Sequence, residues 1–251
     1  MKPKLSYTIW FSQRTGSTLL SKALAATGIA GIPYEWLYTD TQDLMMDYGA
    51  RNHAHLQEIL WEKGSTPNGV CGVKVSFVEP HITKVMDTFK QFPGEAETRS
   101  GSQVWEKAFP NCRHIFMTRR NKVRLAVSWW KAIKSGEWHR KQGQAPTGND
   151  VADDYSFDAI HHLLIESALR EAGIQEFLSE KGIVPLTIVY EDFIRDYEGT
   201  VRGVLEYLDL PGHRDAIIEP PYFDKLADEL SEQWVQRFRQ ERQAGWDNRG
   251  W

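Results

Sequence analysis

"IWFSQRTGSTLLSKAL", residues 9–24, reads as a buried strand, a loop rich in glycine, serine and threonine, and the first turns of a helix. In such a unit the loop amides and the N-terminus of the helix present N–H donors to one anion. Taken alone, the loop would more often be a tight turn with a helix cap. Together with the strand before it and the helix after it, the loop makes a phosphate-binding, P-loop-like fold the first hypothesis.

The loop departs from the pattern that binds nucleoside triphosphates, G-x-x-x-x-G-K-[ST]. Gly16 and Thr18 fit that pattern, but Phe11 stands at the leading glycine and Ser17 at the lysine. Arg14 is the only cation of the loop and comes earlier than the pattern requires. The sequence therefore predicts an anion other than the triphosphate end of a magnesium-bound nucleotide.

Composition and charge indicate one ordinary globular domain over residues 1–251. The chain is 41% hydrophobic and 25% charged, with a formal net charge of -4, so its balance favours neither nucleic acid nor an anionic membrane. Cys71 and Cys112 lie in apolar runs, where free thiols are commoner than a disulfide. No apolar run approaches the roughly 20 residues of a membrane span. We expect a soluble, cytoplasmic protein without integral membrane contact.

Short apolar runs alternate with helical patterns, which predicts a central, mainly parallel sheet in a three-layer α/β/α fold. The predicted strands are residues 5–11, 70–77, 114–118 and 184–189. The predicted helices are residues 17–27, 53–63, 79–89, 122–134, 157–180, 198–208 and 229–242. Two polar segments, 91–103 and 135–154, are predicted to be mobile surface loops, and the second is placed where substrate lids often occur.

Ligands of an open parallel sheet bind beyond the carboxyl ends of the strands. Besides the loop after the first strand, the third predicted strand is followed by Arg119 and Arg120, and Ser128 comes nine and eight residues after them. An arginine just before a helix and a serine nearly two turns inside it could meet around a second anion. Tyr190 follows the fourth strand, where a ring can stack on a base. Two anion sites and a stacking ring describe a nucleotide phosphorylated at two places.

Five segments in order resemble the sulfotransferases that use 3'-phosphoadenosine 5'-phosphosulfate. They are "QRTGSTLL", "TGIAGIPYEW" from Thr27, "TPNGVCGVK" from Thr66, "RRNKVRLAVSWWKA" and "YEDF". The chain is most similar to the bacterial Stf-type family, which includes trehalose and lipopolysaccharide sulfotransferases. The resemblance extends from about Tyr7 to Trp234 and rests on the order and spacing of the segments.

This resemblance implies roles for particular residues, all of them expectations at this point. Glu35 would be the catalytic carboxylate, and Arg14 would act with it on the reacting group. The candidate donor-binding residues are Gln13, Arg14, Thr15, Gly16, Ser17, Thr18, Arg119, Arg120, Ser128 and Tyr190. Residues 14–18 would hold the 5'-phosphosulfate, whereas Ser128 with either Arg119 or Arg120 would hold the 3'-phosphate. The candidate acceptor-binding residues are Glu35, Trp36, Lys74 and Trp130.

The chemistry of sulfuryl transfer is consistent with these residue types. An acceptor oxygen and a leaving phosphate lie in line with sulfur, and the protein supplies positioning and charge stabilisation. A sulfuryl group carries less charge than a phosphoryl group, so no metal is required. His53 and His55 lack a further ligand at metal spacing, and we assign no metal. The acceptor hydroxyl needs a base, and Glu35 is the candidate.

Several alternatives stay open on the sequence alone. Lys74 in a buried strand could reach the reacting centre or form a salt bridge. The expected acceptor is a hydroxyl of a carbohydrate or glycolipid, with a trehalose-like saccharide as one candidate. The arginine-rich C-terminal segment could close over the nucleotide or form a homodimer surface. The competing functions are a P-loop kinase-like phosphotransferase and a non-catalytic nucleotide-binding protein. The product of the expected reaction is adenosine 3',5'-bisphosphate.

Overall fold

A computed structural model describes residues 1–94 and 100–244 of the chain. Within them, four parallel strands form one sheet in the order β2-β1-β3-β4. The strands are β1 (Leu5–Phe11), β2 (Val70–Ser76), β3 (Cys112–Thr118) and β4 (Leu186–Val189). The predicted parallel sheet is confirmed. After β1 the chain forms β2 on one side of β1 and then crosses to form β3 on the other side. The direction of strand addition reverses there, and a crevice opens at the carboxyl ends of β1 and β3.

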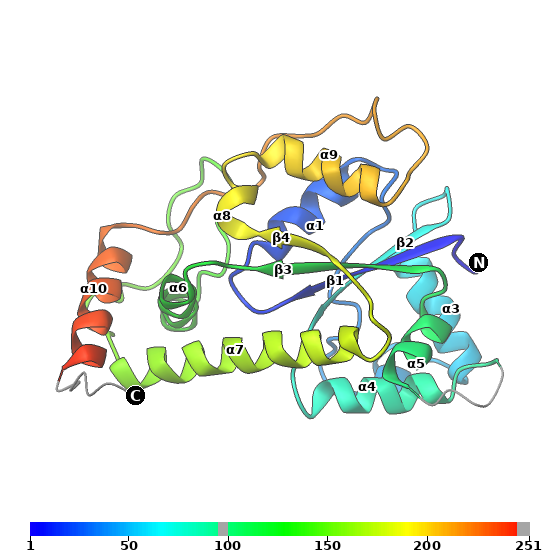
Figure 1. Ribbon diagram of the computed structural model, residues 1–251, viewed down its shortest axis with the longest axis horizontal. Helices are drawn as coiled ribbons and strands as arrows, with labels where there is room; N and C mark the ends of the chain where they lie inside the picture. The colour runs from blue at the N-terminus through cyan, green and yellow to red at the C-terminus, as the bar shows by residue number, and fades with distance from the viewer. Residues whose placement is uncertain (95–99, 245–251) are drawn as a thin grey trace.

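Helices cover both faces of the sheet, as Figure 1 shows: α1, α8 and α9 lie on one face, and α3, α4, α5 and α7 lie on the other. The helices are α1 (Ser17–Ala26), α2 (Leu44–Asp47), α3 (His53–Gly64), α4 (His81–Lys90), α5 (Gly101–Ala108), α6 (Lys122–Ser135), α7 (Phe157–Ser179), α8 (Tyr190–Phe193), α9 (Tyr197–Tyr207) and α10 (Glu229–Gln243). The three-layer α/β/α architecture is therefore confirmed.

The alternation of side chains along β1 explains why both faces need a helical layer. Trp10 is fully buried in the cluster formed with α3, α4, α5 and α7. Its neighbours Ile9 and Phe11 point the other way, into the cluster formed with α1 and α9. A strand that is apolar on both faces stays in a sheet only if both faces are covered.

A third cluster lies beyond the carboxyl ends of the strands and joins α6, α7 and α10. Leu125 and Trp129 of α6 pack there against Leu163 of α7 and Phe238 of α10. This packing fixes α6 directly behind the end of β3. It also carries α7 along the underside of the sheet to the same end, which the order of the helices in the sequence does not reveal.

The structure corrects the sequence prediction at three short helices, α2, α5 and α8, which were not expected. The segment predicted as a loop up to residue 103 already contains the start of α5, because Ser100 and Gln103 form a capping box there. Residues 95–99 of that segment, and the predicted C-terminal segment from residue 245 onwards, lie outside the described residues. The four predicted strands and seven predicted helices are all present, with ends shifted by a few residues.

Candidate active site

A cavity of about 760 Å³ opens beyond the carboxyl ends of the strands. Its walls come from the loop after β1, the segment that follows α1, helices α6 and α7, the end of β4, and two loops around residues 138–139 and 221–227. This volume is in the range of small-molecule sites. The cavity lies at the ends of the strands, where the sequence analysis predicts the ligand-binding residues.

The loop after β1 folds tightly because Gly16 has a φ of 84° and packs against an aromatic ring. A Cβ on Gly16 would lie 2.8 Å from Cδ2 of Tyr190, so only glycine allows both the backbone conformation and the contact. Thr15 is fully buried, and its hydroxyl donates to the carbonyl of Ser12 at 2.8 Å. The Thr15 side chain therefore closes the loop, while Gly16, Ser17 and Thr18 line the cavity.

Arg14 connects the loop to α6 and to the segment that follows α6. Its Nε donates to Oγ of Ser128 at 3.0 Å, and its Nη1 donates to the carbonyl of Trp138 at 2.6 Å. Burial, followed by the nearby Arg119 guanidinium, lowers the pKa of Arg14 to about 10, so it stays charged at neutral pH. The half-buried Arg14 and the buried Arg119 repel each other, so an anion bound between them would be stabilised by both charges.

The structure brings Arg119 to the cavity and leaves Arg120 outside it. Arg119 is buried, its guanidinium lies 4.6 Å from the ring centroid of Tyr190, and burial lowers its pKa. Its Nε has no hydrogen-bond partner among the described residues and lies 3.8 Å from Oε1 of Glu191. Arg120 is exposed and pairs with Asp192 at 2.7 Å. Arg119 is thus the cation placed beside Tyr190.

Glu35 is positioned by a short pairing of its own segment with β2. Tyr34 bridges to Val73 in parallel, and the amide of Lys74 donates to the carbonyl of Tyr34 at 2.9 Å. The Lys74 Nζ then lies 2.7 Å from Oε1 of Glu35 and donates to the hydroxyl of Thr18 at 2.9 Å. Burial lowers the pKa of Lys74, and Glu35 opposes that effect. Lys74 therefore forms the salt bridge considered above and joins the carboxylate to the loop.

The aromatic residues that reach the cavity differ in part from those chosen from the sequence. Trp129, Trp138 and Tyr38 line it. Trp36 and Trp130 do not line it, and each donates its indole N–H to a backbone carbonyl at 2.8 Å. Trp129 and Trp130 are adjacent in α6, so the sequence could name the pair, but only the packing of α6 against α7 shows which ring faces the cavity.

His139 lines the cavity and was missed by the sequence reasoning, because no motif marks it. Its ring stacks on Phe223 with centroids 4.9 Å apart and planes 28° apart. Burial chiefly, and then Arg14 and Lys74, lower the pKa of His139 to about 4, which leaves it neutral at pH 7. His139 lines the same cavity as Glu35 and Arg14.

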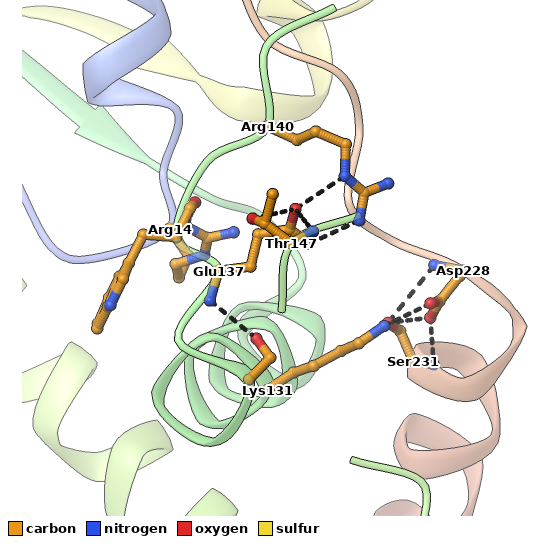
Figure 2. A network of polar contacts seen from close by, with 9 residues as sticks. Arg14, Lys131, Glu137, Arg140, Thr147, Asp228 and Ser231 are labelled. Carbon is orange, nitrogen blue, oxygen red and sulfur yellow. Dashed lines mark hydrogen bonds and ion pairs between the residues drawn. The ribbon is translucent and has the colours of Figure 1, made fainter. Parts of the chain in front are cut away.

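The segment predicted as a lid, 135–154, forms part of a roof together with residues 221–228. The two segments pair where Lys141 bridges to Phe223, and Glu137 binds Arg140 at 2.6 Å. Figure 2 shows this Glu137–Arg140 contact beside the contact of Lys131 with Asp228, whose Nζ and Oδ2 lie 2.5 Å apart. The arginine contact lowers the pKa of Glu137 to about 2. The Glu137–Arg140 pair therefore stabilises the turn within residues 135–154, and the Lys131–Asp228 pair ties the end of residues 221–228 to α6.

In residues 1–94 and 100–244, no group of three or more His, Cys, Asp or Glu side chains is placed to hold a metal ion. The helices of that same part are all too short or too polar to cross a membrane. Cys71 and Cys112 are free thiols.

The chain is similar in sequence to known sulfotransferases. The family model described as Stf0 sulphotransferase matches residues 6–241 of the chain. Trehalose 2-sulfotransferase of Mycolicibacterium smegmatis is 26% identical, with 95% of this chain and 96% of that protein covered. Trehalose 2-sulfotransferase of Mycobacterium tuberculosis is also 26% identical, with 94% of each covered. A solved sulfotransferase domain from the Synechococcus PCC 7002 olefin synthase is 14% identical over 95% of both chains, with a TM-score of 0.39, too low to support a conclusion.

Proposed function

The chain belongs to the Stf0 sulphotransferase family, and we propose that it transfers a sulfuryl group from 3'-phosphoadenosine 5'-phosphosulfate to a hydroxyl of a carbohydrate. The observation that supports this donor is a pair of cations in the wall of one cavity. Arg14, in the loop after β1, contacts Ser128, and Arg119 lies against Tyr190. The names of the similar trehalose sulfotransferases support a saccharide acceptor.

The residues present fit a nucleotide with two separate phosphate positions. We assign the 5' end to the backbone and hydroxyl groups of Gly16, Ser17 and Thr18, where a helix N-terminus favours negative charge. We assign the 3'-phosphate to Arg119 and Ser128, because the Arg119 Nε is buried without a hydrogen bond from the described residues. A smaller cavity of about 290 Å³ adjoins the main one at both of these residues.

In this proposal Glu35 takes the proton of the acceptor hydroxyl. Lys74 occupies its Oε1 and leaves Oε2 for the acceptor. The donor supplies the sulfuryl group: a bond forms between the acceptor oxygen and sulfur while the bond from sulfur to the 5'-phosphate oxygen breaks, and the bisphosphate leaves. Lys74 also contacts Thr18, so it keeps the base and the donor loop at a fixed separation. Positioning and charge stabilisation then provide the catalysis.

The acceptor side of the cavity suits a sugar ring. Trp129, Trp138 and Tyr38 offer flat apolar faces beside Glu35, and His139 offers a neutral polar group. We propose a trehalose-like saccharide, free or as part of a glycolipid. We also propose that residues 1–251 form a single sulfotransferase domain. Cytoplasmic location and a homodimer stay predictions.

Thermal unfolding with nucleotides tests the donor assignment. Adenosine 3',5'-bisphosphate should raise the melting temperature, because at about 100 times its dissociation constant a ligand of the folded state adds roughly 2.7 kcal/mol. For a chain of this size that corresponds to a shift of about 5–10 °C. The shift should persist in EDTA, since the assigned contacts come from arginine, backbone and hydroxyl groups. An equal or larger shift with magnesium-ATP would favour the phosphotransferase alternative instead.

A further inference from the structure

One arginine of helix α7 lies in the wall of the cavity, although it is distant in sequence from the loop after β1. Arg170 lines the cavity, and its Nη1 donates to Oε1 of Gln13 at 2.5 Å and to Oγ of Ser76 at 3.4 Å. Its Nε donates to Oε1 of Glu166 at 2.7 Å. Its guanidinium also lies 4.9 Å from the ring centroid of Trp129. These contacts hold the arginine on four sides.

The contact with Arg170 determines which way the Gln13 amide faces. A guanidinium can only donate hydrogen bonds, so the Gln13 atom that meets it must be the carbonyl oxygen. The Ser76 hydroxyl lies at 3.4 Å from the same oxygen. The Gln13 NH2 group therefore points away from Arg170, and it makes no hydrogen bond within the described part of the chain. Gln13 lines the cavity, so a donor pair is available to a ligand there.

Gln13 lies on the side of the loop that faces the base. Side chains two residues apart on a strand share a face, so Ser76, which contacts Gln13, and Lys74, which contacts Glu35, project from the same face of β2. The cation of the loop, Arg14, points instead to Ser128. The Gln13 amide is thus on the acceptor side of the loop, where negative oxygens of the transferring group would lie.

We propose that Arg170 is a positioning residue that orients the Gln13 amide, and that the Gln13 NH2 group donates to an oxygen of the transferring sulfuryl group. This inference rests on the proposed function and adds two residue roles to it. Sulfuryl oxygens only accept hydrogen bonds, which requires a donor at this point. Without Arg170 the amide can turn over and present its oxygen, which would repel the sulfuryl group.

A double-mutant cycle with Arg170→Met and Gln13→Leu tests this role. Each single variant should lower turnover by about 10- to 100-fold, the range expected for a hydrogen bond to a charged group. Because Arg170 acts through Gln13, the double variant should be no slower than the Gln13→Leu variant, within about twofold. Multiplied losses in the double variant would overturn the inference.

Nucleotide binding supplies a readout that does not depend on the acceptor. Gln13→Leu should weaken binding of 3'-phosphoadenosine 5'-phosphosulfate by about tenfold and leave binding of adenosine 3',5'-bisphosphate unchanged, because only the first carries the sulfuryl group. Equal losses for both nucleotides would contradict the assignment. Wild-type protein that binds neither nucleotide would instead overturn the proposed function itself. This comparison holds even if Arg170→Met fails to fold.

Arg202→Met is the matched control. Arg202 pairs with Glu198 one helical turn earlier at 2.8 Å, in the same arrangement as Arg170 and Glu166, but on α9 and outside the cavity wall. The Arg202→Met variant should therefore have the turnover of the wild type. Arg170→Lys keeps the charge but loses the planar guanidinium with its several N–H donors. Its turnover should therefore lie between those of the wild type and Arg170→Met. A rate equal to that of the wild type would count against the orienting role.

Discussion

Replacing Glu35 by glutamine should lower turnover by about 100-fold or more while the affinity for adenosine 3',5'-bisphosphate stays within about twofold, the pattern expected when a base is lost. Glutamine keeps the size of the side chain and most of its hydrogen bonds but cannot take a proton at neutral pH. Glu35 lines the cavity, and the proposed 3'-phosphate site lies at Arg119 and Ser128, two other residues of its wall. The substitution should therefore affect the rate and leave the nucleotide in place. Steady-state kinetics and calorimetric titration measure the two effects.

The Lys74 ammonium requires a control, because Glu35→Gln removes the partner of a cation that is only 2% exposed. Glu35→Asp keeps the charge but draws the carboxylate back, so it should melt closer to the wild type and still be slow. Glu58→Gln, at an exposed position of α3, should change neither property. Near-normal turnover of Glu35→Gln at saturating acceptor would refute the base assignment, and His139→Gln would then be the variant to examine.

Arg119→Ala should weaken binding of adenosine 3',5'-bisphosphate by about 10- to 150-fold, because charge-assisted hydrogen bonds contribute about 1.5 to 3 kcal/mol each. Arg119 is buried against Tyr190, where water screens its charge little. Calorimetric titration of the bisphosphate measures the loss.

Arg120→Ala is the matched control for this assignment. Arg120 is adjacent in sequence and carries the same charge, but it is exposed and paired with Asp192. Its removal should change the affinity by less than about twofold, as for most exposed ion pairs. Ser128→Ala should weaken binding in the same direction as Arg119→Ala. If the loss followed Arg120 and not Arg119, the 3'-phosphate site would have to be moved.

The sheet was predictable because its strands are short, largely apolar runs that alternate with helical patterns. The runs ending at Phe11 and Thr118 are mostly buried, so they require cover on both sides, and the helices between them supply it. The loop between Phe11 and Ser17 was predictable for a similar local reason, since its glycine and hydroxyl residues follow a strand directly. The short helix α5 was not predictable, because its start depends on one capping box within a polar segment.

The residues of the site were predictable only where they belong to one local sequence motif. The sequence left Arg119 and Arg120 as alternatives, because it does not show the contact of Arg120 with Asp192, which lies 72 residues later and keeps Arg120 outside the cavity. Arg170 reaches Gln13 across 157 residues. His139 arrives through the pairing of two roof segments. Such contacts follow from tertiary packing and leave no local pattern.

Transfer of radiolabelled sulfuryl groups from 3'-phosphoadenosine 5'-phosphosulfate to a panel of saccharides, in the presence of EDTA, tests the central claim most directly. The panel should contain trehalose, other disaccharides and lipid-linked saccharides. We predict a labelled saccharide with the wild-type protein and Glu58→Gln, and at least about 100-fold less label with Glu35→Gln. No labelled product with any acceptor, together with transfer of the γ-phosphoryl group from magnesium-ATP to one of them, would contradict the account.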